Sequence, residues 1–420
     1  MNASLACKIT AGNPQPWEIR HVLQSTKGSS PSTITVVKAT VPALEQYGPL
    51  ITKTMYRRLF ENDHIAALFN QANQQKGTQR LALAHAVLAY ARNIENLEVL
   101  GAAVERIAQK HIGYAILPEH YPFVGQALLG AIEEVLGDAA TPDILAAWGE
   151  AYWFLADLLI AREATIRAGI EAQQGGWTGW RRFTVAERHV EAEGIVSFVL
   201  RPEDGGPVVA HKPGQYLTLR FDAAGLPGVK RNYSISSTPS DESYRITVKR
   251  EAEGEASRFL HDHALVGTIL ETTPPAGDFH LSDNPPRPVV LLSGGVGLTP
   301  MVSMLEVLAR RHRDVPVHYV HGTSSPAHHA LSRQVQDAAT RHGNIVVSTF
   351  YESGADVPAH SGRISMDWLR NSVPLTEADI YLCGPRPFLR YFVAGLREAG
   401  VPADRIHYEF FGPADEQLAA

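Results

Sequence analysis

The chain has 420 residues, of which 45% are apolar and 20% charged, and its formal net charge is −6. This length predicts two to three domains at roughly 150 residues each, and the mild negative charge argues against a nucleic acid partner. The cysteines, Cys7 and Cys383, are too few for a disulfide framework, so a reducing cytoplasm is the expected location.

Residues 1–30 are expected to form a flexible tail, because they contain two prolines and a Gly-Ser-Ser run and lack the charged start and apolar core of a secretory signal. The longest apolar stretch covers residues 144–161, and Glu150 and Asp157 interrupt it. A membrane span needs about 20 predominantly apolar residues. We therefore predict a buried amphipathic helix here and no membrane anchor.

Residues 31–174 are predicted to form an all-α domain. Apolar residues recur three and four positions apart, as at Leu83, Val87 and Tyr90, which is the period of an amphipathic helix. Proline and glycine mark where helices are expected to end. These predicted ends lie at Gly48-Pro49, at Pro118 and at Thr141-Pro142-Asp143.

The chain changes character after the helical part. Short runs with alternating apolar residues, separated by turn residues at intervals of about ten, predict a small antiparallel β-barrel over residues 175–284. Strand and helix patterns then alternate over residues 285–420, which is typical of an α/β domain with a doubly wound parallel sheet. The predicted parallel strands lie at 289–293, 316–321, 345–350 and 379–383.

One histidine has the setting of a heme ligand. His111 ends the helical run VERIAQKH, with Val104, Ile107 and Ala108 on the same side, and a neutral imidazole on a helix is a usual axial ligand. No C-x-x-C-H sequence occurs, so covalent attachment of heme is excluded. Spacing alone favours the alternative that His111 merely satisfies carbonyl groups at a helix end.

Several longer segments resemble the globin domain of bacterial flavohemoglobins, and the resemblance extends from about residue 32 to residue 420. These segments are LFNQANQ (68–74), GTQRLALAHAVLAYARNIENL (77–97), VERIAQKH (104–111) and PEHYPFVGQALL (118–129). The resemblance implies that His111 is the proximal ligand of heme b and that Phe69 packs against the heme.

The same resemblance implies further residues on both sides of the heme. Tyr56, Gln79 and Leu83 would line the distal side, where a hydroxyl and an amide can donate hydrogen bonds to bound O₂. Tyr121 and Glu163 would lie near the histidine on the proximal side. A carboxylate that accepts the imidazole N–H pushes electron density toward the iron.

The residues alone leave another interpretation of Glu163 open. An anonymous glutamate on a helix is usually a solvated charge, and here it could pair with Arg162 or Arg167.

The sequence RNYS (231–234), with VKRE (248–251) and GEASRFLH (254–261), resembles the flavin-binding barrel of ferredoxin reductases. Arg231 can bind a phosphate in a bidentate manner, and a helix that starts near Gly254 can hold a pyrophosphate on its N–H groups. An arginine and a tyrosine that only face each other across strands are the alternative. The implied FAD contacts are Tyr216, Arg231, Asn232, Tyr233, Ser234, Gly254 and Ser257.

Two glycine-containing elements point to a nicotinamide nucleotide, NAD(P)H. GGVGLTP (294–300) follows a predicted strand and precedes a predicted helix, with Thr299 placed to cap that helix, and YLCGP (381–385) ends another strand. Cys383 could instead be a small buried apolar residue. By resemblance, the nucleotide contacts are Gly294, Gly295, Gly297, Thr299, Cys383, Gly384 and Pro385, while Glu409 and Phe411 of YEFFGP (408–413) border the flavin.

The resemblance implies a nitric oxide dioxygenase, in which NAD(P)H reduces FAD, FAD reduces the heme, and the reduced heme uses O₂ to convert NO to nitrate. No protein partner is expected. The alternatives are a heme-based gas carrier or sensor with a maintenance reductase, and a general flavin reductase. The choice between NADH and NADPH stays open, with Ser324, Ser325 and Arg333 as candidate phosphate contacts.

Overall fold

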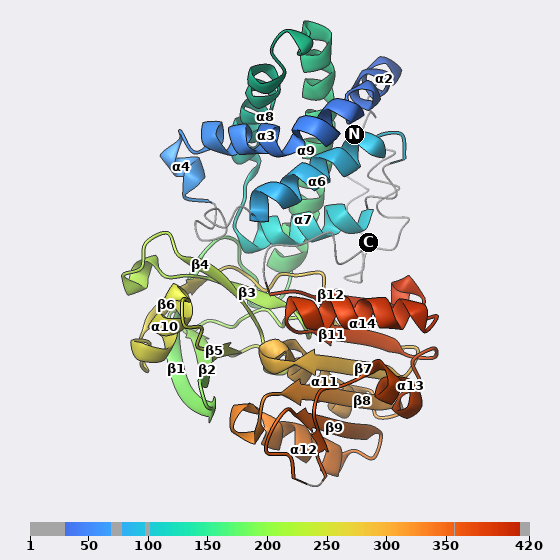
Figure 1. The fold of residues 1–420 in the computed structure, drawn as a ribbon. Helices are drawn as coiled ribbons and strands as arrows, with labels where there is room; N and C mark the ends of the chain where they lie inside the picture. Colours follow the sequence, from blue (N-terminus) through green and yellow to red (C-terminus); the bar gives the residue numbers. More distant parts are fainter. Residues whose placement is uncertain (1–29, 69–77, 97–100, 357, 412–420) are drawn as a thin grey trace, which may run out of the picture. The chain divides into compact units, whose positions relative to one another are not determined.

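The computed structural model describes residues 30–68, 78–96, 101–356 and 358–411, and it divides the chain into a helical unit, up to about Gln173, and a β-rich unit from Gln174 onward (Figure 1). This architecture confirms the predicted fold class, because helices, an antiparallel sheet and a parallel sheet follow one another along the chain. The predicted domain boundary at residues 284–285 lies inside the β-rich unit and stays a prediction.

The helical unit is built around α3, α8 and α9, whose apolar faces form its core. Ile51 and Met55 from α3, Leu128 and Ile132 from α8, and Trp148 from α9 are all buried in one cluster. The helices are α2 (Pro31–Ala39), α3 (Val41–Leu59), α4 (Asp63–Ala66), α6 (Thr78–Arg92), α7 (Gly101–Gly113), α8 (Tyr121–Leu136) and α9 (Pro142–Glu171).

The predicted helix end at Gly48-Pro49 is wrong, because α3 continues through Pro49 to Leu59. A proline inside a helix removes one backbone hydrogen bond and crowds the carbonyl group four residues earlier. The burial of Ile51 and Met55 on the turns beyond Pro49 offsets this cost, and the Thr52 hydroxyl donates a hydrogen bond to the Gly48 carbonyl at 3.0 Å. Packing therefore overrides the local signal.

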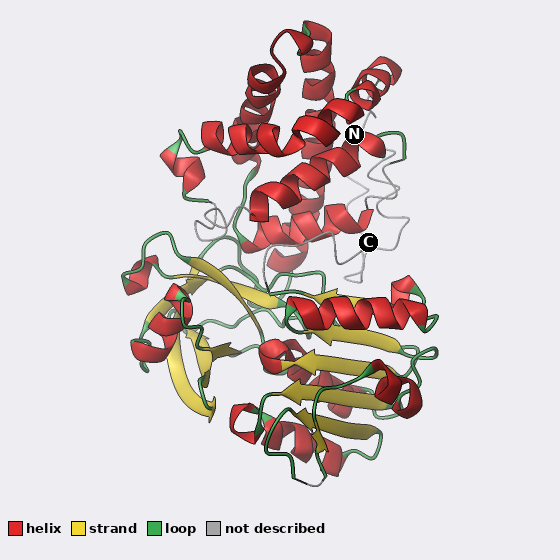
Figure 2. Cartoon of the chain, in the orientation of Figure 1, coloured by secondary structure: helices red, strands yellow, loops and turns green. Residues whose placement is uncertain are grey.

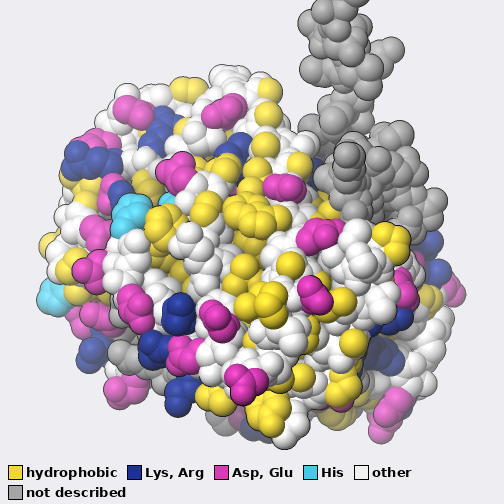
Figure 3. All heavy atoms as spheres, turned by 90° about the horizontal axis from the view of Figure 1, so that it is seen from above, with side chains coloured by type: hydrophobic (Ala, Val, Ile, Leu, Met, Phe, Trp, Pro, Cys, Tyr) yellow, Lys and Arg dark blue, Asp and Glu magenta, His cyan; other side chains and the backbone are white. Residues whose placement is uncertain are grey.

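Among the described residues, α9 is the one helix whose length and apolar composition would allow it to cross a membrane. It starts at Pro142, behind a Thr141 side chain that accepts a hydrogen bond from the Ile144 N–H. Its Trp148, Ala151 and Phe154 side chains are buried in the helical unit. Figure 3 shows this unit from above, with charged side chains of both signs among the apolar ones. The helix thus packs as the buried amphipathic helix that the sequence predicts.

The first sheet of the β-rich unit is antiparallel, with strand order β4-β3-β6-β1-β2-β5. An isolated bridge between Ile235, just beyond β4, and Ile246 in β5 brings the two edge strands together, and Phe183, Phe198 and Leu219 fill the interior. The strands are β1 (Arg181–Ala192), β2 (Ile195–Pro202), β3 (Tyr216–Arg220), β4 (Lys230–Ser234), β5 (Tyr244–Lys249) and β6 (Ile269–Thr272). This is the small antiparallel barrel that the sequence predicts.

The second sheet is parallel, with strand order β10-β9-β8-β7-β11-β12. Its strands are β7 (Val289–Gly294), β8 (Val317–Thr323), β9 (Ile345–Tyr351), β10 (His360–Ser361), β11 (Asp379–Cys383) and β12 (Ile406–Glu409). The four predicted strands are confirmed, and β10 and β12 are additional.

Helices cover the parallel sheet on both faces (Figure 2). One apolar core joins the sheet to α11 (Leu298–Arg311) and α12 (Ser332–Arg341), and a second joins it to α13 (Met366–Ser372) and α14 (Arg386–Glu398). The chain leaves β7 first toward β8 and later returns to β11 on the other side of β7. The carboxyl ends of β7 and β11 thus form a topological switch point, where such sheets bind ligands.

Replacing Pro49 by Ala restores a backbone donor inside α3. We expect Pro49→Ala to raise the free energy of unfolding of the helical unit by about 1–2 kcal/mol, the cost of an interior proline less its effect on the unfolded chain. Pro142→Ala is the matched control, because proline at a first helical position loses no hydrogen bond. Urea unfolding followed by helical ellipticity tests this, and equal stability of the two variants would contradict it.

Candidate functional site

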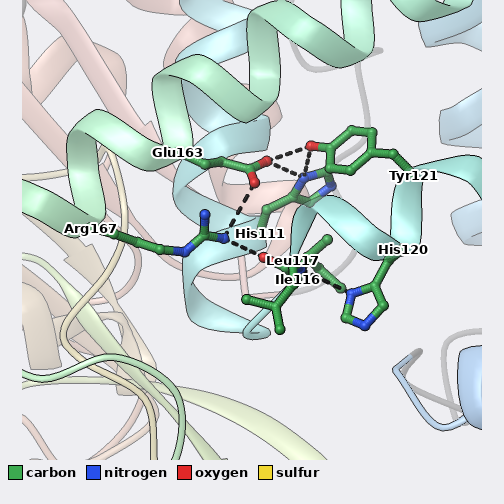
Figure 4. Close-up of polar contacts among 7 residues, drawn as sticks. All are labelled: His111, Ile116, Leu117, His120, Tyr121, Glu163 and Arg167. Carbon is green, nitrogen blue, oxygen red and sulfur yellow. Dashed lines mark hydrogen bonds and ion pairs between the residues drawn. The ribbon is translucent and has the colours of Figure 1, made fainter.

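Three helices bring the predicted proximal residues together (Figure 4). His111 lies in the last turn of α7, Tyr121 begins α8, and Glu163 lies on α9. The His111 Nδ1 atom is 2.7 Å from Glu163 Oε1 and 3.0 Å from the Tyr121 hydroxyl, and that hydroxyl donates to the same Glu163 oxygen at 2.5 Å. The structure therefore assembles a His-Tyr-Glu triad from residues far apart in the sequence.

Local chain geometry places the first two members of the triad. The Ile116 N–H donates to the His111 carbonyl at 2.9 Å, which closes the turn after α7. A short 3₁₀ turn, Pro118–His120, follows, and the Leu117 N–H donates to His120 Nδ1 at 2.9 Å. This turn reverses the chain so that α8 begins with Tyr121 directed at His111.

Glu163 is fully buried, with 0% of its surface exposed, so it is not a solvated helix charge. It also pairs with Arg167, whose Nη2 atom lies 3.3 Å from Glu163 Oε2, whereas Arg162 instead binds Glu105 at 2.6 Å. The alternative of an Arg167 pair thus coexists with the triad. Burial, and then the Glu163 carboxylate, raise the pKa of Tyr121, so its hydroxyl stays protonated and keeps donating.

The geometry of His111 suits an axial heme ligand. A carboxylate that accepts the proton of Nδ1 leaves the lone pair on Nε2, and Nε2 makes no hydrogen bond to any residue that the structure describes. The imidazole is 30% exposed, so a ligand can reach it. Within the described residues, no group of three or more His, Cys, Asp or Glu side chains could hold a metal ion by itself. The position and exposure of the His111 imidazole fit a heme iron held by one protein nitrogen.

The distal residues are only partly described. Tyr56 lies on α3, is 5% exposed, and its ring centroid is 5.6 Å from that of Phe60. Gln79 and Leu83 lie four residues apart on α6, and their side chains, like all of Phe69, lie outside the described part of the chain.

The predicted flavin motif forms strand β4, in which Ser234 lies directly opposite Tyr216 of β3. The Ser234 hydroxyl is buried and has no hydrogen-bond partner among the described residues, and Thr218 on β3 has a hydroxyl in the same condition. Buried polar groups are normally hydrogen-bonded, so the Ser234 hydroxyl fits an edge of the flavin, whereas the Thr218 hydroxyl lies where a Cβ atom on Gly113 would be 2.9 Å away.

The other residues predicted to contact the flavin lie on β4 and at the start of α10 (Glu255–Asp262). Arg231 and Tyr233 lie two residues apart in β4, with Asn232 between them. Their side chains therefore point to the same face of the sheet. Helix α10 begins directly after Gly254, as predicted. The Ser257 hydroxyl accepts from the Glu251 N–H and donates to the Gly254 carbonyl, each at 3.1 Å. It therefore orders the turn before the helix.

The two predicted nucleotide elements meet at the switch point. Ser293 of β7 pairs with Cys383 of β11, and a Cβ atom added to Gly297 would overlap the Cys383 carbonyl. Gly295 has a φ of +55°, a conformation that favours glycine. The glycine-rich turn can pack against the end of β11 only because side chains are missing there.

Other residues predicted to contact the nucleotide lie near this contact. Gly294 and Gly384 both face the Phe388 ring, which a Cβ atom on either would meet at 3.0 or 2.8 Å. Pro385 precedes the first turn of α14. The predicted capping role of Thr299 is wrong, because a 3₁₀ turn makes it the second residue of α11, where its hydroxyl donates to the Val296 carbonyl at 3.1 Å.

The C-terminal part of the described chain adds β12 beside β11, with Glu409 opposite Cys383. Cys383 is fully buried, and burial, followed by Glu409, raises the pKa of its thiol. Phe411 is 43% exposed. Its neighbour Phe410 packs on the sheet core with the Arg386 guanidinium 4.9 Å from its ring centroid, a contact that the sequence analysis did not predict.

A helical unit with a His-Tyr-Glu triad, and a barrel followed by a nucleotide-type sheet, define the class: a globin joined to a reductase of the ferredoxin-reductase type. Residues 53–159 match the globin family, and residues 291–393 match the oxidoreductase NAD-binding domain family. A flavohemoprotein of Xylella fastidiosa (strain 9a5c) is 60% identical over 392 residues, which cover 93% of this chain and 99% of that protein. The chain belongs to the flavohemoprotein family.

Solved structures agree with this assignment. The crystal structure of a flavohemoglobin from Malassezia yamatoensis, with bound FAD and heme, matches with a TM-score of 0.82 and 29% identity over 92% of this chain and 100% of that one. The flavohem-like FAD/NAD-binding domain of nitric oxide dioxygenase from Vibrio cholerae O1 biovar El Tor matches with a TM-score of 0.52 and 36% identity. That match covers 56% of this chain and 99% of the other.

Adding a methyl group at Gly297 should damage the nucleotide site selectively. We expect Gly297→Ala to destabilise the β-rich unit by about 1–3 kcal/mol, as overpacking does, and to slow reduction of bound FAD by NADH at least tenfold. Gly343→Ala is the control, because a Cβ atom there meets nothing within 4 Å. Flavin bleaching in a stopped-flow instrument measures the rate, and unchanged reduction in Gly297→Ala would contradict the close packing.

The ligand assignment can be tested by removing the imidazole. We expect His111→Ala to lose heme while FAD stays bound, because the flavin residues lie in the other unit. Absorbance spectra after gel filtration give both occupancies. A normal heme spectrum in this variant would exclude His111 as the axial ligand.

Proposed function

We propose that the protein is a nitric oxide dioxygenase in which NAD(P)H reduces FAD, FAD reduces heme, and NO is converted to nitrate with O₂. The observation that carries this proposal is the His111-Tyr121-Glu163 triad on a chain that also holds a reductase fold. Family membership supports it, as does the similarity of the β-rich unit to a domain of a nitric oxide dioxygenase.

On the proximal side, His111 would hold the heme through Nε2, while Glu163 and Tyr121 orient the imidazole. A bound heme supplies an iron centre that takes one electron at a time and binds gases. A carboxylate acceptor makes the imidazole a stronger electron donor, which favours O₂ activation over reversible carriage. The triad therefore supports an enzyme rather than a gas carrier or sensor.

On the distal side, Tyr56 and Gln79 would donate hydrogen bonds to the bound gas, and Leu83 and Phe69 would pack around the heme. A buried tyrosine hydroxyl is a suitable donor toward negative charge, and Tyr56 is buried on α3.

In the reductase, FAD would accept a hydride and release its electrons singly. Arg231 would bind a flavin phosphate, Tyr233 would pack on the ring, and Ser234 would supply its hydroxyl, which has no partner in the described part of the chain. Further FAD contacts would come from Tyr216, Asn232, Gly254 and Ser257, with Glu409 and Phe411 bordering the flavin. The nucleotide would contact Gly294, Gly295, Gly297, Thr299, Cys383, Gly384 and Pro385.

The substrates would be NO and O₂, with no obligatory protein partner, and the location would be the cytoplasm. The overall reaction balances as two NO, two O₂ and one NAD(P)H giving two nitrate ions, NAD(P)⁺ and one proton. Each NO loses three electrons on becoming nitrate, each O₂ gains four, and the nucleotide supplies the difference.

The deciding experiment is NO consumption by the heme- and FAD-loaded protein in the presence of NADH and O₂, with nitrate quantified. We expect one nitrate per NO and one NADH per two NO, and no NO-dependent turnover in His111→Ala. Oxidation of NADH without loss of NO would contradict the proposal and indicate a flavin reductase that carries a gas-binding globin. Repeating the assay with NADPH gives the nucleotide preference.

A further inference from the structure

Arg167 lies one helical turn beyond Glu163 on α9 and makes two contacts around the proximal triad (Figure 4). Its Nη2 atom is 3.3 Å from Glu163 Oε2, and the same nitrogen donates to the Ile116 carbonyl. The guanidinium is 17% exposed, beside a carboxylate with no exposure. This is a largely desolvated ion pair, which is coupled much more strongly than a surface pair at the same spacing.

The two oxygens of Glu163 have different partners. Oε1 accepts from both His111 and Tyr121, whereas the contact to Oε2 comes from Arg167. The Ile116 residue that Arg167 also binds donates its N–H to the His111 carbonyl. One guanidinium therefore holds both the carboxylate that accepts the His111 proton and the turn that follows His111.

The positive charge has a second consequence. A carboxylate paired with a guanidinium has less negative charge to share with a further donor, so the hydrogen bond from His111 Nδ1 becomes weaker than it would be to a lone carboxylate. The imidazole then has less imidazolate character, and the ferric iron that imidazolate favours is less stabilised. The same cation also disfavours ferric iron directly by Coulomb repulsion.

We propose that Arg167 is a positioning residue that fixes Glu163 and limits the electron donation of the proximal ligand, so that the heme stays reducible by the flavin. This inference rests on the proposed heme function and assigns a role to a residue that does not touch the heme ligand itself. The triad increases electron donation from the imidazole to the iron, and Arg167 limits the extent of that donation.

The test compares variants of the full, heme- and FAD-loaded protein by heme midpoint potential and by the iron–histidine stretching frequency of the ferrous form. Arg167→Met removes the charge at similar length. We expect a higher stretching frequency and, at a fixed potential, at least a threefold higher ferric-to-ferrous ratio, which equals a fall of about 28 mV at ~59 mV per tenfold change. Arg167→Lys keeps the charge, so we expect its stretching frequency and midpoint potential to stay close to those of the unsubstituted protein.

Arg162→Met is the matched control. Arg162 lies on the same helix with 18% exposure and also makes an ion pair to α7, but its partner is Glu105 rather than the triad. A merely structural effect of losing a buried arginine would move both variants alike. Unchanged readings in Arg167→Met, a shift in the opposite direction, or an equal shift in Arg162→Met would overturn the proposal.

Glu163→Gln separates this inference from the proposed function. Removing the carboxylate charge should lower the stretching frequency and raise the potential, opposite to Arg167→Met. If Glu163→Gln shifts both readings and Arg167→Met does not, the role of Arg167 is wrong and the triad stands; if neither variant shifts, both assignments are wrong. Should Arg167→Met fail to retain heme, Arg167→Gln keeps a donor for the Ile116 carbonyl and has the same expected shifts.

Discussion

The helical site depends on the burial of one carboxylate. Glu163 has no exposed surface, and an ionised group taken out of water is costly unless partners replace its hydration. His111, Tyr121 and Arg167 supply those partners. Because they come from α7, α8 and α9, the arrangement is complete only when the three helices are packed together. The packing of this unit therefore also fixes the geometry of the His111 imidazole.

The nucleotide site depends on the close approach of two backbone segments rather than on a buried charge. The turn after β7 can lie against the end of β11 because Gly297 has no side chain to meet the Cys383 carbonyl. Gly294 and Gly384 leave room beside Phe388 in the same way. The proximal site depends on the hydrogen bonds that polar side chains make, whereas the switch point depends on glycines that have no side chain.

The sequence predicted those elements whose signal is local and strong. Strand β7 is an unbroken apolar run followed by glycines, and it lies where expected. Strand β12, whose sequence IHYE is short and half polar, takes its form from pairing with β11 and has little local signal. Pro49 and Thr299 carry local signals that led to wrong predictions, of a helix end and of a helix cap. Tertiary packing and a 3₁₀ turn outweigh these local preferences. The triad itself came from family resemblance, since His111 and Glu163 are 52 residues apart.

Arg167 marks the limit of sequence reasoning most clearly. Its spacing from Glu163 is that of an ordinary helix-surface pair, which contributes little stability in water, so from the sequence alone this pair is an alternative to the triad. In the fold the same pair is buried and bound to the turn after His111. The spacing is identical in both cases, and the dielectric environment decides which one applies. Because burial is a property of the packed helices, a local charge pattern cannot reveal that Glu163 both joins the triad and pairs with Arg167.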